Sequence, residues 1–167
     1  KHNGFVNVYS EEKKGSTFNV FFPVLDKDMQ ETKEETPGFQ GGNEHVFVID
    51  DEPSLLKSLQ EILEKLGYRV TTSQATSKAL KEIQSHSGKY DLIVTDQTMP
   101  DMTGLELAKA VKKINNDIPI ILISGFNENI NEKELKQAGI IRYLAKPVGA
   151  AKLDRAIRSV IDGNHQK

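Results

Sequence analysis

The sequence contains no cysteine and no tryptophan among its 167 residues, and it has no apolar run long enough to cross a bilayer. The lack of cysteine excludes disulfides and thiol chemistry. The 22 lysine and arginine residues nearly balance the 24 aspartate and glutamate residues. The resulting formal charge of −2 provides no net positive electrostatic potential that would attract nucleic acid. We therefore expect a cytoplasmic protein with no nucleic-acid partner and no direct membrane contact; a membrane anchor elsewhere in a parent chain stays open.

The first residues, "KHNGFVNVYS", lack both an initiator methionine and the apolar core of a signal peptide. We therefore interpret the chain as a piece of a longer protein. Its length leaves room for one ordinary globular domain and a smaller appendage.

Composition divides the chain into segments. Residues 26–43 are polar, lean acidic and contain Pro-Gly and Gly-Gly pairs, which is typical of a linker. Residues 4–10 and 16–24 are rich in Phe, Val and Tyr and are joined by a charged turn with a glycine, which predicts a β-hairpin too small to be stable alone. The predicted organisation is a hairpin segment, a linker, a main domain and a tail, at residues 1–25, 26–43, 44–163 and 164–167.

In the main domain, apolar runs alternate with stretches of helical periodicity. The helix predicted over 128–137 is the weakest, with only two large apolar anchors, Ile130 and Leu135. The run 120–123 does not alternate with polar residues, as expected of a strand buried on both faces. The pattern predicts a doubly wound α/β fold with a five-stranded parallel sheet, whose strands are residues 45–50, 68–73, 91–96, 118–124 and 140–146.

Polar side chains stand at the carboxyl ends of four of these strands. Asp50 and Asp51 follow the first, Asp96 the third, Ser124 the fourth and Lys146 the fifth. If the second strand is the edge, in the order 2-1-3-4-5, these ends are adjacent and converge on one crevice. Any one of these polar residues is explained by a strand that ends at the solvent, but the whole set indicates a binding or catalytic site.

The chemistry of this set points to phosphate. Three carboxylates brought together repel one another unless a cation lies between them, and oxygen-only ligands favour Mg²⁺. Lys146 offers a point charge for a phosphate, and the Ser124 hydroxyl can donate to a phosphate oxygen. Because a carboxylate can attack phosphorus, Asp96 is the candidate nucleophile.

The motifs "VIDDE", "VTDQTMPDMTG", "ILISG" and "YLAKP" resemble, in order and spacing, the receiver domain of two-component response regulators, over roughly residues 44 to 163. The resemblance implies a flavodoxin-like fold with strand order 2-1-3-4-5 and a cis Lys146–Pro147 bond. It also implies a phosphoacceptor (Asp96), a switch hydroxyl and a switch aromatic (Ser124, Tyr143), a phosphate partner (Lys146) and a Mg²⁺ site (Asp50, Asp51, Asp96 and the Thr98 backbone carbonyl).

The hairpin has a resemblance of its own. The stretches "HNGFVNVYSE" and "GSTFNVFFP" resemble the last two strands of a histidine-kinase ATPase domain, although Lys13 replaces the first glycine of the closing glycine-rich box. The motifs that hold Mg-ATP are missing, so this chain should not bind ATP. Residues 1–25 are then the remnant of an ATPase domain, and the whole resembles the C-terminal part of a hybrid sensor histidine kinase.

These resemblances imply a phosphorelay function. Asp96 would accept a phosphoryl group from a phosphohistidine on a kinase dimerisation domain or a histidine phosphotransfer domain. The domain would then switch at the face formed by the helix over 128–137, the strand over 140–146 and the last helix, whose apolar face carries Leu153, Ile157 and Ile161. The face formed by these three elements also offers a homodimer interface. One alternative is a phosphohydrolase of the haloacid dehalogenase kind, which needs an acid/base Asp where this chain has Thr98. Another is a stand-alone response regulator.

Overall fold

The computed structural model describes residues 3–23, 39–125 and 130–164. The chain divides into two compact units, residues 1–36 and 37–167. Each unit is described by itself.

The first unit is an antiparallel hairpin. Strands β1 (Phe5–Glu11) and β2 (Gly15–Phe21) pair in register from one end to the other. Gly15, the first residue of β2 after the turn, has φ +109°, a conformation that glycine adopts without strain. Every residue of both strands is exposed. A two-stranded ribbon without a core is at best marginally stable by itself.

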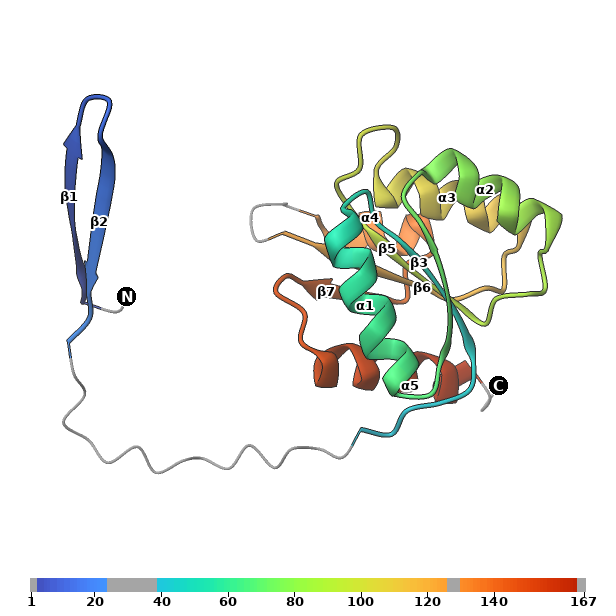
Figure 1. Cartoon of the computed structure of the whole chain (residues 1–167). Helices are drawn as coiled ribbons and strands as arrows, with labels where there is room; N and C mark the ends of the chain where they lie inside the picture. The colour runs from blue at the N-terminus through green and yellow to red at the C-terminus, as the bar shows by residue number, and fades with distance from the viewer. Residues whose placement is uncertain (1–2, 24–38, 126–129, 165–167) are drawn as a thin grey trace. The chain divides into compact units, whose positions relative to one another are not determined.

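The second unit contains a five-stranded parallel sheet in the order β4-β3-β5-β6-β7 (Figure 1). In the order of the strands within this unit, that arrangement is 2-1-3-4-5, so the predicted flavodoxin-like α/β topology is confirmed. The strands are β3 (His45–Ile49), β4 (Arg69–Ser73), β5 (Leu92–Asp96), β6 (Ile120–Ser124) and β7 (Arg142–Ala145).

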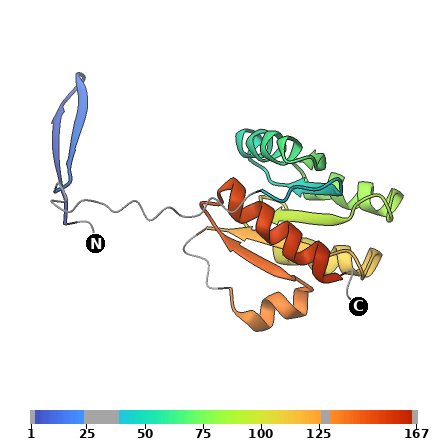
Figure 2. The ribbon, with the colours of Figure 1, turned by 90° about the horizontal axis from the view of Figure 1, so that it is seen from below.

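Five helices cover both faces of the sheet. They are α1 (Pro53–Lys65), α2 (Thr76–Ser85), α3 (Gly104–Ile114), α4 (Glu132–Ala138) and α5 (Ala150–Asn164). Helices α1 and α5 pack on one face, α2, α3 and α4 on the other; Figure 2 shows α5, in red, lying across the strands. No helix in the described ranges is both long and apolar enough to cross a membrane.

Helix α4 is the shortest, in agreement with its weak apolar pattern. It begins at Glu132, later than the predicted start at residue 128, which lies outside the described residues together with residue 129. The Asn131 side chain accepts a hydrogen bond from the Glu134 N–H while the Glu134 side chain accepts one from the Asn131 N–H, and Gly139 at φ +73° ends the helix. The caps at both ends therefore compensate for the small number of apolar residues that anchor α4.

The core consists of two apolar layers, one on each side of the sheet. Along β3, Val46 and Val48 contact the layer under α1 and α5, whereas Phe47 and Ile49 contact the layer under α2, α3 and α4. All four side chains are buried. Burial of each such side chain contributes about 1.5–3 kcal/mol, so the strands are rigid supports for the residues at their carboxyl ends.

We expect removal of residues 1–36 to leave the unfolding free energy of the second unit unchanged within about 0.5 kcal/mol. The reason is that both apolar layers and all five parallel strands lie in residues 37–167. Calorimetric and denaturant unfolding of the full and shortened chains measures this. A loss above about 1 kcal/mol would mean that the first unit supports the second.

Candidate functional site at the carboxyl edge of the sheet

The carboxyl ends of the strands surround one open pocket. Its lining comes from the ends of β3 and β5, the start of α1 and the loops after β6 and β7: Asp50, Asp51, Glu52, Pro53, Asp96, Thr98, Gly125 and Lys146. The structure thus brings together five of the seven predicted site residues. The other two, Ser124 and Tyr143, lie in β6 and β7 and do not line the pocket.

Asp96, the last residue of β5, is the central carboxylate of the pocket. Its side chain is buried (6% exposed), yet both oxygens have partners. Oδ1 lies 2.5 Å from the Lys146 Nζ, and Oδ2 accepts a hydrogen bond of 2.7 Å from the Thr98 N–H. The ion pair and the hydrogen bond offset the cost of burying this carboxylate.

Asp50 is the second buried carboxylate (4% exposed). Its Oδ1 accepts a 2.8 Å hydrogen bond from the Glu52 N–H, and its Oδ2 lies 3.5 Å from the Lys146 Nζ. Burial raises the pKa of the Asp50 carboxyl, although the Glu52 N–H and the Lys146 ammonium oppose that shift.

Lys146 is the cation between the two carboxylates. Burial lowers its pKa, but the hydrogen bond to Asp96 and the charges of Asp50 and Asp96 outweigh burial, so the pKa of Lys146 is raised overall. The sequence predicts that a cation separates these carboxylates and assigns the role to Mg²⁺. In the structure the lysine already supplies one positive charge there.

The remaining donors fit a hydrated Mg²⁺. Within residues 3–23, 39–125 and 130–164, no three Asp, Glu, His or Cys side chains form a ready-made metal cage. Instead, Asp50 and Asp96 converge, while the exposed Asp51 and Thr98 line the same pocket. Because Mg²⁺ keeps several waters and is usually held by one or two carboxylates, this oxygen-only set fits it.

The predicted switch residues lie on one face of the sheet. Leu122 pairs with Tyr143, and Ser124, two residues further along β6, therefore points to the same side as Leu122. Ser124 is fully buried and its Oγ donates to the Gly125 carbonyl at 3.2 Å, whereas Tyr143 is half-buried against the layer under α2, α3 and α4. The Lys146–Pro147 bond is cis, as the resemblance implies.

Gly104 and Gln97 support the site in ways that the sequence did not reveal. A Cβ at Gly104 would lie 2.3 Å from the Asp96 carbonyl oxygen, so α3 can start there only with glycine. The Gln97 carbonyl accepts a hydrogen bond from the Gly104 N–H at 2.9 Å, and the Gln97 Oε1 accepts one from the Leu105 N–H at 3.2 Å. The sequence shows only a glycine at a loop exit; the close approach depends on the fold.

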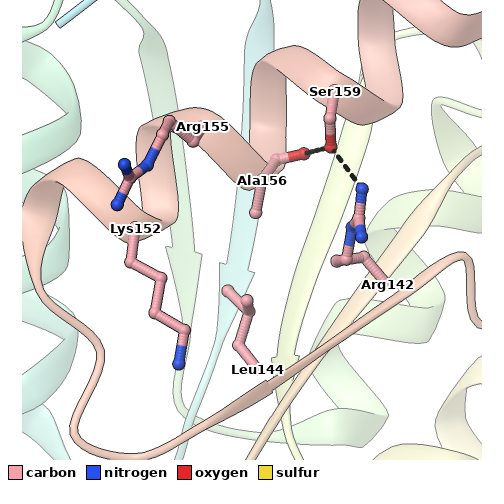
Figure 3. A pocket seen from close by; sticks show the side chains of 6 residues that line it. All are labelled: Arg142, Leu144, Lys152, Arg155, Ala156 and Ser159. Carbon is pink, nitrogen blue, oxygen red and sulfur yellow. Dashed lines mark hydrogen bonds between the residues drawn. The ribbon is translucent and has the colours of Figure 1, made fainter. Parts of the chain in front are cut away.

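A separate basic groove lies between β7 and α5 (Figure 3). Its floor is apolar and its rim is cationic, and it is lined by Arg142, Leu144, Lys152, Arg155, Ala156 and Ser159. Arg142 donates to the Ser159 hydroxyl at 3.0 Å, which in turn donates to the Ala156 carbonyl at 2.9 Å. In the described parts of the chain, no carboxylate forms an ion pair with any of the three basic side chains.

The family model of the response regulator receiver domain matches residues 46–158, which contain all seven predicted site residues. The chain belongs to the response regulator receiver domain family. This membership favours the receiver interpretation over the haloacid dehalogenase-like alternative.

Curated relatives of this receiver domain are proteins of two-component signalling. The chain is 27% identical over 168 residues to the sensor kinase CckA of Brucella abortus, covering 95% of this chain and 18% of that protein. It is 35% identical over 114 residues to the two-component response regulator ARR11 of Arabidopsis thaliana, covering 68% and 22%. The chain therefore spans about a fifth of the length of these relatives.

Solved structures share the fold of this receiver domain. A receiver domain protein from Clostridium thermocellum superposes with a TM-score of 0.70 at 28% identity, covering 74% of this chain and 98% of that one. The chemotaxis protein CheY4 of Vibrio cholerae superposes with a TM-score of 0.65 at 28% identity, covering 71% and 99%. The matched region is thus nearly the whole of each solved receiver.

We expect Gly104→Ala to destabilise the domain by about 1–3 kcal/mol, because the new methyl group would press on the Asp96 backbone. Gly88→Ala is the matched control, since a Cβ there has no atom within 4 Å. Denaturant unfolding of both variants measures the difference. Equal losses for the two variants would show that the contact at Asp96 is relieved by a small shift.

Proposed function

We propose that this receiver domain takes a phosphoryl group from phosphohistidine onto Asp96. One Oδ atom forms the new O–P bond as the P–N bond of the donor breaks, and the electron pair of that bond stays on the imidazole. The observation that supports this assignment most strongly is the buried Asp96 carboxylate, held by the Thr98 N–H at 2.7 Å and by the Lys146 ammonium at 2.5 Å.

Each neighbour has a distinct role in this proposal. The Thr98 N–H fixes the orientation of the Asp96 carboxylate, and Lys146 can exchange its ion pair with Asp96 for one with the incoming phosphoryl oxygens. Mg²⁺, held by Asp50, Asp51, Asp96 and the Thr98 carbonyl, would neutralise charge on the phosphoryl group. A CheY of Borrelia burgdorferi, a structural neighbour at 24% identity and a TM-score of 0.66, was solved in a complex with BeF3 and Mg²⁺.

Phosphorylation would act on the switch residues. The phosphate on Asp96 would attract the Ser124 hydroxyl, and the half-buried Tyr143 would turn into the space that Ser124 leaves. This change biases the face of α4, β7 and α5, where we place the homodimer interface. The charges on that face are of both signs, because α4 carries Glu132 and Glu134 beside Lys133 and Lys136 while the groove beside α5 is basic; a self-complementary contact between two copies can pair such charges.

The parent chain is proposed to be a hybrid sensor histidine kinase. Two observations support this proposal. The first is that the match to the sensor kinase CckA covers 95% of the chain, which is more than the residues 46–158 matched by the receiver family. In addition, the hairpin exposes Phe5, Tyr9 and Phe18 at 65–67%, as expected of two strands that belong to a larger sheet. The donor of the phosphoryl group is then a kinase dimerisation domain or a histidine phosphotransfer domain.

Asp96→Asn is expected to abolish phosphate uptake from a phosphohistidine donor, because an amide is a poor nucleophile. Phosphate on the unmodified chain should be released by hydroxylamine, since an aspartyl-phosphate is a mixed anhydride. The control is Asp101→Asn, an exposed carboxylate on the same loop, which should keep full uptake. Hydroxylamine-sensitive labelling of Asp96→Asn with radioactive phosphate would identify another carboxylate as the acceptor.

We expect Asp51→Asn to abolish Mg²⁺-dependent phosphorylation, while Glu52→Gln keeps it. Both side chains line the pocket and are exposed, but the Glu52 Oε1 accepts a 2.6 Å hydrogen bond from the Ser54 hydroxyl. Titration of Mg²⁺ followed by NMR, together with the phosphorylation rate, compares the pair. Retained Mg²⁺ binding in Asp51→Asn would remove Asp51 from the ligand set.

A further inference from the structure

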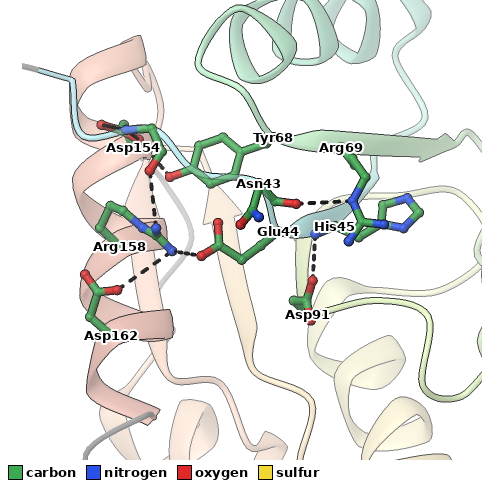
Figure 4. Close-up of polar contacts among 10 residues, drawn as sticks. Asn43, Glu44, His45, Tyr68, Arg69, Asp91, Asp154, Arg158 and Asp162 are labelled. Atoms are coloured by element: carbon green, nitrogen blue, oxygen red, sulfur yellow. Dashed lines mark hydrogen bonds and ion pairs between the residues drawn. The ribbon is translucent and has the colours of Figure 1, made fainter.

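The segment immediately before β3 is docked on α5 (Figure 4). The Asp154 side chain, 2% exposed, accepts hydrogen bonds from the Gln40 N–H at 2.9 Å and the Gly41 N–H at 3.2 Å. It also accepts one from the Tyr68 hydroxyl at 2.9 Å. The buried Asp154 carboxylate thus has three hydrogen-bond donors, and two of them are backbone N–H groups of the segment before β3. We call residues 40–44 the latch segment.

Arg158, one helical turn after Asp154, holds the other side of the latch segment. Its Nη1 donates to the Gly41 carbonyl at 3.2 Å, and its Nη2 forms an ion pair with Glu44. The Arg158 guanidinium also lies over the ring of Tyr68, 5.7 Å from its centroid. The charged pair of α5 therefore contacts both the backbone and a side chain of the latch segment.

The glycine pair of the latch segment fits this site closely. Gly41 has φ +60°, and a Cβ there would lie 2.2 Å from the Leu66 carbonyl oxygen. A Cβ on Gly42 would lie 2.7 Å from the Tyr68 ring, and the Gly42 N–H donates to the Leu66 carbonyl at 3.1 Å. The sequence assigns these glycines to the linker, whereas their contacts join them to the second unit.

Helix α5 connects the latch segment to the crevice. The latch segment precedes the amino end of β3, whereas Asp50 follows its carboxyl end, so the two sites lie at opposite edges of the sheet. Helix α5 begins four residues after Lys146 and carries Asp154 and Arg158. Its Leu153 and Ile157 are fully buried, so α5 is a tightly packed, rigid element between the two sites.

We propose that the docking of the latch segment on α5 is weakened when phosphate occupies the crevice. The conformational change at the crevice is thereby transmitted to the segment that joins the linker to β3. This inference rests on the proposed function. The docked geometry belongs to the state in which Lys146 is paired with Asp96 and Asp50. When Lys146 turns to a phosphoryl group, the loop of residues 147–149 and the start of α5 shift away from the position that fits the latch segment.

Amide hydrogen exchange of the full chain, measured by NMR, tests the docking. The amides of Gln40, Gly41 and Gly42 should be protected, and Tyr68→Phe should speed their exchange about fivefold through loss of one hydrogen bond to Asp154. The control is Tyr90→Phe, which removes a hydroxyl that donates to Glu82 at 2.9 Å and should leave these amides unchanged. Unprotected amides in the unaltered chain would overturn the proposal.

Beryllofluoride with Mg²⁺, a mimic of the phosphoryl group, tests the coupling. We expect the exchange of the Gln40, Gly41 and Gly42 amides to become at least twofold faster, while the Gln97 and Thr98 amides report binding at the crevice. If the crevice amides respond and the latch amides do not, the coupling is refuted and the proposed function stands. If the crevice amides do not respond either, both fail.

Discussion

The ion pair of Lys146 with two buried carboxylates is the interaction on which the site depends. Asp50 and Asp96 come from the ends of β3 and β5, and Lys146 follows β7, so the pair ties three strand ends together. Removing one partner of a fully buried pair costs about 3–5 kcal/mol. The cost here is smaller because the Lys146 side chain is 34% exposed and water screens its charge, but the two carboxylates would still lose their shared cation. An ammonium group held beside a carboxylate is also what an incoming phosphoryl group requires. Under the proposed function, stability and phosphate chemistry therefore rest on the same contact.

The sheet could be predicted from the sequence because its signals are local. The short apolar runs before Asp50 and Asp96 favour strands buried on both faces, and residues 46–49 contact both apolar layers. The convergence of Asp50, Asp96 and Lys146 was predicted on the condition that the strand order is 2-1-3-4-5, since parallel strands bring their carboxyl ends to one edge. Helix α4 was the least certain because its stability comes from the caps at Asn131 and Gly139 more than from apolar periodicity.

The latch segment could not be predicted because its partners are distant in sequence. The Gln40 N–H and Asp154 are 114 residues apart, and a Gly-Gly pair has the same composition in a free linker and in a close-packed turn. One signal was available: Asp154 stands among Leu153, Ile157 and Ile161 on the apolar side of α5, where a carboxylate needs donors. Similarly, the need for glycine at 104 arises only when β5 and α3 meet.

Helix α5 has a different neighbour on each of its sides. Leu153 and Ile157 pack into the apolar layer shared with α1. Asp154 and Arg158 bind the latch segment. Lys152 and Arg155 line the basic groove beside β7. Its 15 residues form a rod of about 22 Å. Because the rod starts just after Lys146, a small displacement at the crevice changes the groove and the latch together. The same movement can therefore reach the basic groove and the latch segment at the opposite edge of the sheet, without a separate pathway for each.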